Sequence, residues 1–103
     1  MATKFELQPK PTFKANVEIP RAGEEPGVLT FTFRHKSADQ IKEMEKREGA
    51  TAIDFLSEII EGWALPEPYT RENLTVLLNN YLSAAGAITE KYYAELMGHR
   101  EKN

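Results

Sequence analysis

Residues 51–103 read TAIDFLSEIIEGWALPEPYTRENLTVLLNNYLSAAGAITEKYYAELMGHREKN, and they hold most of the apolar side chains of this chain. At the start of this stretch, apolar side chains recur at intervals of three and four residues, the period of one helical face, at Ala52, Ile53, Leu56, Ile59, Ile60 and Trp63. Thr51, with Asp54 three residues later, resembles a capping box and predicts where this helix begins. Gly62 can adopt the left-handed conformation that ends a helix, so we expect the helix to stop there.

An elbow rich in proline follows, over residues 64–69. Pro66 and Pro68 lack an amide hydrogen and have a fixed φ, so they predict a stiff segment that is not helical. The elbow carries Leu65 and Tyr69 among polar residues, with Trp63 at its edge. Aromatic residues with a polar tip are enriched at protein interfaces. We therefore expect Trp63, Leu65 and Tyr69 to bind a partner; the alternative is that the two aromatic rings only pack in the core.

Two more helices are predicted after the elbow. Thr70 is a typical N-cap residue, and a stripe at helical spacing follows it, made of Leu74, Leu77, Leu78, Tyr81 and Leu82. We favour a break near Ser83, because a Ser-Ala-Ala-Gly run has no large apolar anchor and glycine is unfavourable inside a helix. The alternative is one continuous helix that is weak at Gly86. The period resumes at Ile88, Tyr92 and Leu96, and Gly98 ends it.

The tyrosines of these helices are expected to have different roles. Tyr81 and Tyr92 lie on the apolar stripes, so core packing is expected for both. Tyr93 follows Tyr92 directly, and adjacent residues of a helix point about 100° apart. Both could be buried only if helices covered two sides of this segment. We therefore include Tyr93 among the expected partner-binding residues.

The first part of the chain has the pattern of a β-hairpin. Residues 1–11 contain Pro9 and Pro11 and are expected to form a flexible arm. Over residues 12–36, apolar and polar residues alternate with the period of half-buried strands. Residues 20–27 (PRAGEEPG) predict a connection longer than the tight two-residue turn. A lone hairpin is marginal in water, so its apolar face must pack on the helices or on another subunit.

A polar helix over residues 38–48 follows the hairpin, capped by Ser37 with Gln40 and ended by Gly49. Only Ile41 and Met44 recur at helical spacing on it, which predicts a peripheral position. The predicted fold is therefore α+β, an N-terminal antiparallel β-hairpin followed by a small bundle of three to four α-helices. Residues 12–103 are expected to form one domain, with the hairpin over 12–36 and the helical part over 37–103.

The composition argues against several functional classes. There are no cysteines, so disulfides and Cys-based zinc sites are excluded. His35 and His99 are far apart, and there is no H-E-x-x-H, G-x-S-x-G or P-loop motif. We therefore expect no catalytic residue, no metal site and no cofactor. The net charge is −3, and the nearest approach to a basic stripe is Arg34-His35-Lys36, so no nucleic-acid binding is expected. Neither a signal peptide nor a run of roughly 20 apolar residues is present, so an intracellular protein without a membrane span is expected.

The string IIEGW…LPEPYTRENLTVLLNNYLSAAGAITEKYYAELMGHREKN resembles the C-terminal region of tail assembly chaperones of long-tailed bacteriophages and prophages. The shared features are Gly-Trp at the predicted helix end, an acidic elbow containing proline, a Thr-capped helix with Leu-Leu before Tyr, and a later helix with paired Tyr. The strand-to-helix segment FTFRHKS also fits the family. The resemblance covers about residues 28–103 and rests on structural motifs rather than catalytic ones.

This resemblance implies a non-enzymatic assembly factor. It would bind the tape measure protein, a long helical polypeptide that sets tail length, and keep it soluble during tail morphogenesis. It would also help recruit the tail-tube protein, act as a homo-oligomer in the cytoplasm of the bacterial host, and be absent from the mature virion. The alternative is a structural or adaptor subunit of a phage tail or a tail-like secretion machine. A weaker third alternative is a small regulator of host transcription.

Overall fold

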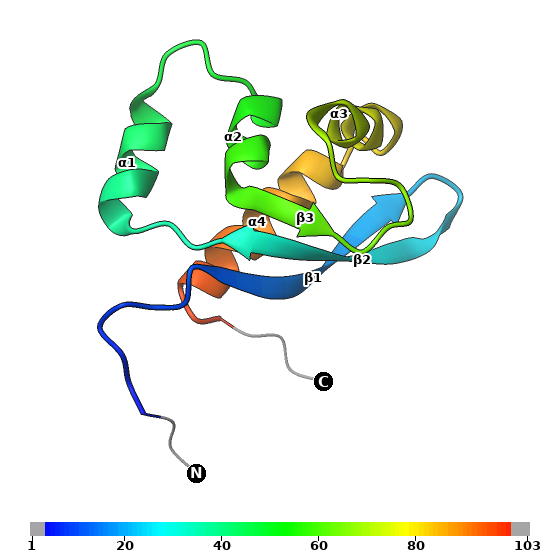
Figure 1. Cartoon of the computed structure of the whole chain (residues 1–103). Coiled ribbons are helices and arrows are strands. Elements are labelled where there is room, and N and C mark those ends of the chain that lie inside the picture. The colour runs from blue at the N-terminus through cyan, green and yellow to red at the C-terminus, as the bar shows by residue number, and fades with distance from the viewer. Residues whose placement is uncertain (1–3, 100–103) are drawn as a thin grey trace.

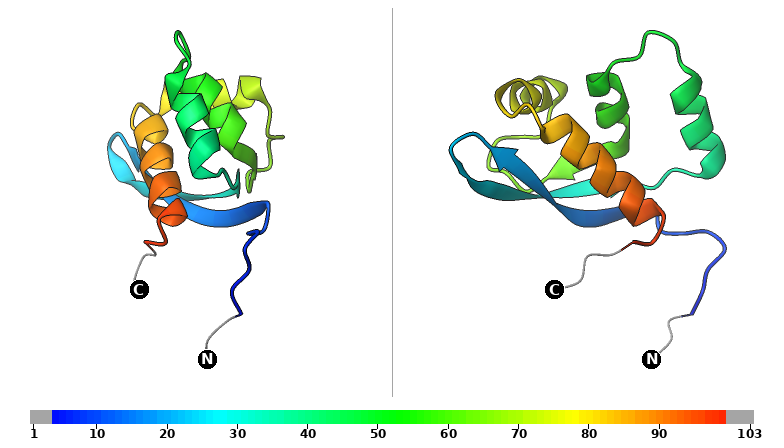
Figure 2. Two further views of the ribbon diagram at one scale, coloured as in Figure 1. Left: turned by 90° about the vertical axis from the view of Figure 1, so that its left-hand side faces the viewer. Right: turned by 180° about the vertical axis from the view of Figure 1, so that it is seen from behind.

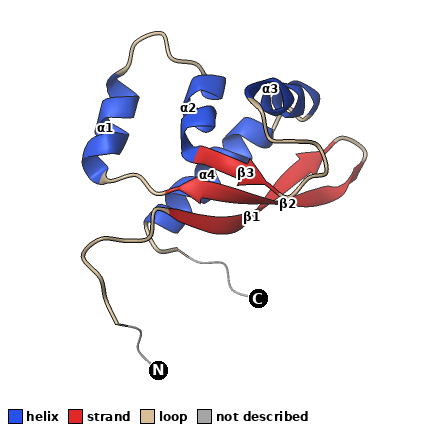
Figure 3. Cartoon of the chain, viewed as in Figure 1, coloured by secondary structure: helices blue, strands red, loops and turns tan. Residues whose placement is uncertain are grey.

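The computed structural model describes residues 4–99. Within this range it has three strands and four helices, in the order β1 (Thr12–Arg21), β2 (Glu24–Arg34), α1 (Ala38–Lys46), α2 (Ala52–Ile59), β3 (Ile60–Trp63), α3 (Arg71–Asn80) and α4 (Ala84–Leu96) (Figure 1). The strands form one antiparallel sheet in the order β1-β2-β3. The predicted α+β class, with an N-terminal hairpin followed by helices, is confirmed (Figure 3).

The two strands of the hairpin pair as the alternation of apolar and polar residues predicts. Phe13 lies opposite Phe33, and Val17 lies opposite Leu29, which places the apolar residues of both strands on one face of the sheet. The predicted long connection is wrong, because Arg21 pairs with Glu24 and leaves only a two-residue turn. Gly23 provides the positive φ of this turn, at +74°. The two prolines of the PRAGEEPG segment therefore lie inside the strands, and Pro20 falls where the register shifts between its neighbours.

The predicted helix end at Gly62 is also wrong. The helix stops at Ile59, and the next four residues form β3, which pairs with β2 through Phe31↔Trp63, Thr32↔Gly62 and Phe33↔Ile60. A register shift lies within this pairing. It allows Ile60 and Trp63 to contact the same core although they are three residues apart. The helical spacing in the sequence therefore also fits a short bulged strand.

The helices lie on the apolar side of the sheet (Figure 2). The residues between these two layers form one core, in which the fully buried large side chains are Val17, Phe31, Phe33, Leu56, Ile59, Ile60, Leu74, Ile88 and Tyr92. Helix α4 packs against β1, and α2 contacts α3, α4 and the strands β2 and β3. Helix α1 lies at the periphery and contributes the buried Met44 and the half-buried Ile41, as its narrow apolar seam predicts.

Most helix boundaries follow the predicted signals. The capping boxes at Ser37 and Thr51 are present, and Thr70 caps α3 by accepting a hydrogen bond from the amide of Asn73. The favoured break near Ser83 is confirmed, since α3 ends at Asn80 and α4 begins at Ala84. The core placement of Tyr81 is wrong: it follows the last residue of α3 and is 37% exposed, because α3 has already ended there.

The N-terminal segment over residues 4–11 has no helix or strand, and its apolar side chains Phe5 and Leu7 are exposed. Residues 1–3 of the predicted flexible arm lie outside the described residues. Phe5 and Leu7 therefore do not pack in the core.

Candidate functional site

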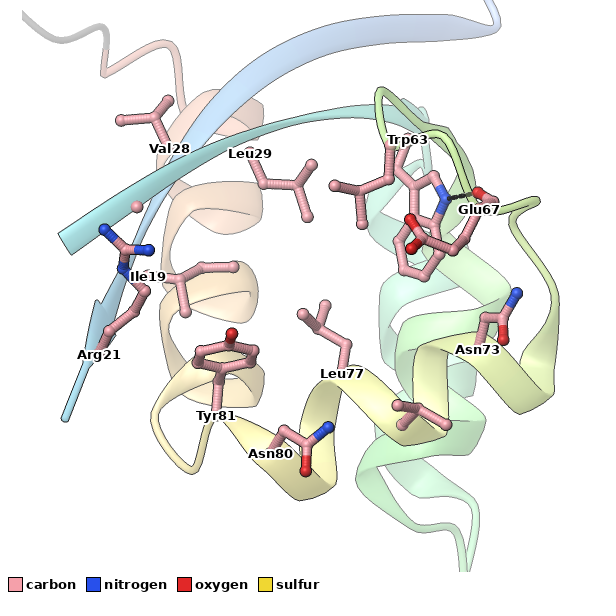
Figure 4. A pocket seen from close by; sticks show the side chains of 13 residues that line it. Ile19, Arg21, Val28, Leu29, Trp63, Glu67, Asn73, Leu77, Asn80 and Tyr81 are labelled. Carbon is pink, nitrogen blue, oxygen red and sulfur yellow. Dashed lines mark hydrogen bonds between the residues drawn. The ribbon is translucent and has the colours of Figure 1, made fainter. Parts of the chain in front are cut away.

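An apolar groove lies between the tip of the hairpin, the elbow and α3 (Figure 4). We name it the hairpin–α3 groove. Its volume is about 380 Å3, and its apolar walls are formed mainly by Ile19, Val28, Leu29, Trp63, Leu65, Val76, Leu77 and Tyr81. In Figure 4, the side chains of Leu77 and Tyr81 face those of Ile19 and Leu29 across the groove. The groove thus brings together three segments that are distant in the sequence.

Trp63 is held in a defined orientation at one end of the groove. Its indole Nε1–H donates a 2.8 Å hydrogen bond to the backbone carbonyl of Glu67 (Figure 4). The ring centroid lies 6.4 Å from that of Phe31 and 5.2 Å from that of Tyr69, the latter in an edge-to-face arrangement. The aromatic wall of the groove is therefore held in place by contacts within the chain itself.

The elbow itself is fixed at both ends. The amide of Ala64 donates a 3.0 Å hydrogen bond to the carbonyl of Thr30 in β2. The side-chain amide of Asn73 donates a 2.8 Å hydrogen bond to the carbonyl of Pro68, which ties the elbow to α3. Leu65, between these anchors, is 39% exposed and lines the groove. The prolines and these bonds together keep Leu65 and Trp63 on the same surface.

Tyr69 contacts Trp63 but does not line the groove. Its hydroxyl group is buried and has no hydrogen-bond partner among residues 4–99. Burial raises the pKa of the Tyr69 hydroxyl, although the nearby charges of Arg34 and Arg71 oppose that shift. Tyr69 therefore supports the indole ring from the side, and its contribution to the groove is indirect.

Tyr93 lies away from the groove, on α4. Its ring stacks on Phe55 at a centroid distance of 6.1 Å, and its hydroxyl donates a 2.9 Å hydrogen bond to Oε2 of Glu45 in α1. Burial, together with the bond to Glu45, raises the pKa of Tyr93 to about 12. Of the four expected partner-binding residues, the structure places Trp63 and Leu65 in the groove, Tyr69 behind it and Tyr93 elsewhere.

Sequence reasoning missed the contributions of the hairpin and of α3. Val28 and Val76 are 63% and 54% exposed, and both line the groove. Val76 lies off the stripe that includes Leu74 and Leu77, and an apolar residue off the buried face is a signal that could have identified it. The hairpin residues could not be found in this way, because only the folded sheet brings them near α3.

The groove has the character of a binding surface. Arg21 lines it but is paired with Glu24 at 3.2 Å, so its charge is largely compensated. Within residues 4–99, no group of three or more His, Cys, Asp or Glu residues is arranged to hold a metal ion. The helices of this same range are all too short or too polar to cross a membrane. An apolar groove with an aromatic wall is suited to receive apolar side chains of a partner.

Comparison with known proteins identifies the family to which this chain is related. A family model described as phage tail assembly chaperone matches residues 1–103. The match extends the resemblance seen over residues 28–103 through the first 27 residues. Comparisons with curated proteins and with solved structures give no match. On the strength of the family match, this chain belongs to the phage tail assembly chaperone family.

Proposed function

We propose that this phage tail assembly chaperone acts without catalysis, by binding the tape measure protein and keeping it soluble while the tail is built. Family membership supports the role in tail assembly. The observation that supports client binding is the hairpin–α3 groove, whose aromatic wall is preorganised by the bond from Trp63 to Glu67. The exposed apolar side chains around it offer contacts that the folded chain does not use itself.

The chemistry of the groove fits an apolar stripe on a helical client. An amphipathic helix binds a hydrophobic groove through side chains spaced three and four residues apart. Exposed Leu65 and Val76, which line the groove together with Trp63, provide positions for such side chains. A few well-packed anchors can supply most of the binding energy of an interface. Many copies along one long client would strengthen weak individual contacts through avidity.

The same proposal includes the place of action. The chaperone would bind its client, and help recruit the tail-tube protein, in the cytoplasm of the bacterial host, and it would leave before the virion is complete. The competing function is a subunit retained in the tail. Quantitative mass spectrometry of purified virions distinguishes them, since a fixed stoichiometric amount of this protein in finished particles would overturn the chaperone proposal.

Client binding is tested by co-expressing this protein with the tape measure protein of the same phage. We expect the soluble fraction of the tape measure protein to rise, and the two proteins to co-purify through a tag on either one. An unrelated acidic protein of similar size, expressed at the same level, is the control. Equal solubility with that control, and no co-purification, would contradict the proposal.

A further inference from the structure

Strand β1 forms one edge of the sheet. All of its residues except Pro20 pair with β2 on one side, and within residues 4–99 no strand pairs with its other side (Figure 1). The amide of His35 donates to the carbonyl of Pro11, and Thr12 lies opposite Arg34. In an antiparallel pair, the residues that exchange hydrogen bonds alternate along the strand. The odd-numbered residues from Pro11 to Ile19 therefore direct their backbone groups toward β2, and the even-numbered ones direct theirs outward.

The outward backbone groups belong to Thr12, Lys14, Asn16 and Glu18. We name this row of N–H and C=O groups the β1 edge. Pro20 comes next in the row and has no N–H, so it marks the end of the segment that can accept another strand. Edge strands of this length are open to pairing with a further chain unless something disfavours it.

The charges on this strand discriminate between possible partners. Lys14, Asn16 and Glu18 are exposed on the outer face of the sheet, so the order along the strand is positive, neutral, negative. A strand with neutral side chains opposite Lys14 and Glu18 would leave both charges uncompensated. A second copy of β1, running antiparallel and centred on Asn16, places each Lys14 opposite a Glu18. Opposite charges facing each other across strands are stabilising, and like charges are destabilising.

The same charges select the register of that pairing. A shift of the centre to Lys14 places two lysines opposite each other, and a shift to Glu18 does the same with two glutamates. Only the centre at Asn16 both pairs the opposite charges and brings the outward backbone groups of the two strands together. On the inner face, this register places Ala15 opposite Val17, so the apolar sides of the two sheets also continue into each other.

Part of the β1 edge, at Asn16 and Glu18, borders a hollow. Helix α4 packs on β1, and a hollow of about 450 Å3 lies between them, lined by Asn16, Val17 and Glu18 and by the small residues Ala87 and Ala94 of α4. Glu90 and Lys91 of α4 also line it, so charges of both signs are present there. The hairpin–α3 groove lies nearer the tip of the hairpin, and from the pairing segment only Ile19 lines it.

We propose that two copies of this chain associate through the β1 edge, antiparallel about a twofold axis at Asn16, and join their two sheets into one continuous sheet. The interface is isologous, so the same residues contribute from both copies. Its specificity comes from the paired Lys14 and Glu18, and its main attraction comes from the backbone hydrogen bonds between the two strands. This dimer does not depend on which client the groove binds.

Single-cysteine cross-linking tests the register directly, because the chain has no cysteine of its own. In the proposed dimer, the two Asn16 Cα atoms are about 5.5 Å apart, within the range that a disulfide spans. We expect Asn16→Cys to give a disulfide-linked dimer under mild oxidation. Thr12→Cys is the matched control, since the two Thr12 residues would be about 26 Å apart. Absence of the Asn16→Cys dimer, or equal cross-linking by Thr12→Cys, would overturn the proposal.

The second test exchanges the charges at positions 14 and 18 and does not depend on a cross-link. Sedimentation should show that Lys14→Glu weakens dimerisation about tenfold, since two attractive pairs become repulsive. The double variant Lys14→Glu/Glu18→Lys restores the pairing and should regain the affinity. Both side chains are exposed, so circular dichroism, and urea unfolding at a concentration where each protein is monomeric, should match the original protein. A monomeric original protein at all concentrations, or a dimer unaffected by Lys14→Glu, would contradict the proposed interface.

Discussion

The hydroxyl group of Tyr92 donates a 2.8 Å hydrogen bond to the backbone carbonyl of Arg34, which lies 58 positions earlier in the chain. The ring of Tyr92 is fully buried, and it contacts the rings of Phe13, Phe33 and Phe55. This one side chain therefore joins α4 to the end of β2 through both apolar contact and a partly buried hydrogen bond. Burial raises the pKa of the Tyr92 hydroxyl to about 12.

The first prediction concerns this bond. Tyr92→Phe keeps the ring but leaves the Arg34 carbonyl without its donor, so the free energy of unfolding should fall by about 1 kcal/mol. Urea denaturation measures the change. Tyr93→Phe is the control, since it removes a hydroxyl bonded to the exposed Glu45 carboxylate, and its loss should be smaller. Equal losses would show that the partly buried bond to Arg34 stabilises the fold no more than the exposed bond to Glu45 does.

The second prediction tests the hairpin–α3 groove. Val76→Asp places a charge on its wall at a position that is 54% exposed. We expect the free energy of unfolding to change by less than about 1 kcal/mol, and client co-purification to fall at least tenfold, because a carboxylate there would be desolvated by an apolar client. Leu82→Asp is the control, since Leu82 is 89% exposed and does not line the groove. If both variants reduce co-purification equally, the groove is not the client site.

The third prediction concerns acid stability. The amide of Thr51 donates a 3.0 Å hydrogen bond to Oδ2 of Asp54, and Nη2 of Arg71 lies 2.6 Å from Oδ1. These partners lower the pKa of Asp54 to about 2, from 3.8. Because the folded-state pKa is the lower one, the carboxylate stabilises the fold above the unfolded pKa, and this stabilisation is lost as the pH falls through the folded pKa.

Urea midpoints measured at several pH values between about 4 and 2 should therefore show a decline that Asp54→Asn reduces. The asparagine variant should already be less stable near neutral pH, since it loses the ion pair and part of the cap of α2. An Asp54→Asn protein with the same acid slope as the original would contradict the role of this carboxylate.

The fourth prediction compares two glycines. An added Cβ would meet no atom within 4 Å at either Gly23 or Gly86, so the backbone conformation alone decides the outcome. Gly23 has a φ of +74°, and Gly23→Ala should cost about 1–2 kcal/mol of stability. Gly86 lies inside α4, and Gly86→Ala should stabilise the protein by about 0.5–1 kcal/mol. Thermal unfolding measures both, and shifts in the same direction would contradict this reasoning.

Local sequence signals predicted a large part of the fold. Ser37, Thr51 and Thr70 were expected as caps, and each one caps its helix in the structure. The alternation of apolar and polar residues predicted the two paired strands of the hairpin and the face of them that is buried. These features depend on contacts within a few residues or on the period of side chains along one element, so they can be recognised without knowledge of the remainder of the fold.

The candidate site was only partly predictable. The proline elbow identified Trp63 and Leu65, because two prolines close to an aromatic residue are a local feature. The placement of Tyr81 in the core was wrong, since helical spacing does not reveal where α3 ends. Val28 and Val76 were missed because they line the groove only after the hairpin and α3 are brought together.

By itself, the sequence determined the hairpin, the helix starts, the core position of Tyr92 and the absence of disulfide bonds, since these follow from residue type and spacing. Only the tertiary structure decided that residues after Ile59 form a strand, because a spacing of three residues fits either a helix or a bulged strand. The exposed edge of β2 settled that choice by offering hydrogen bonds to Ile60–Trp63. The groove arose in the same way, from surfaces that only the folded chain places side by side.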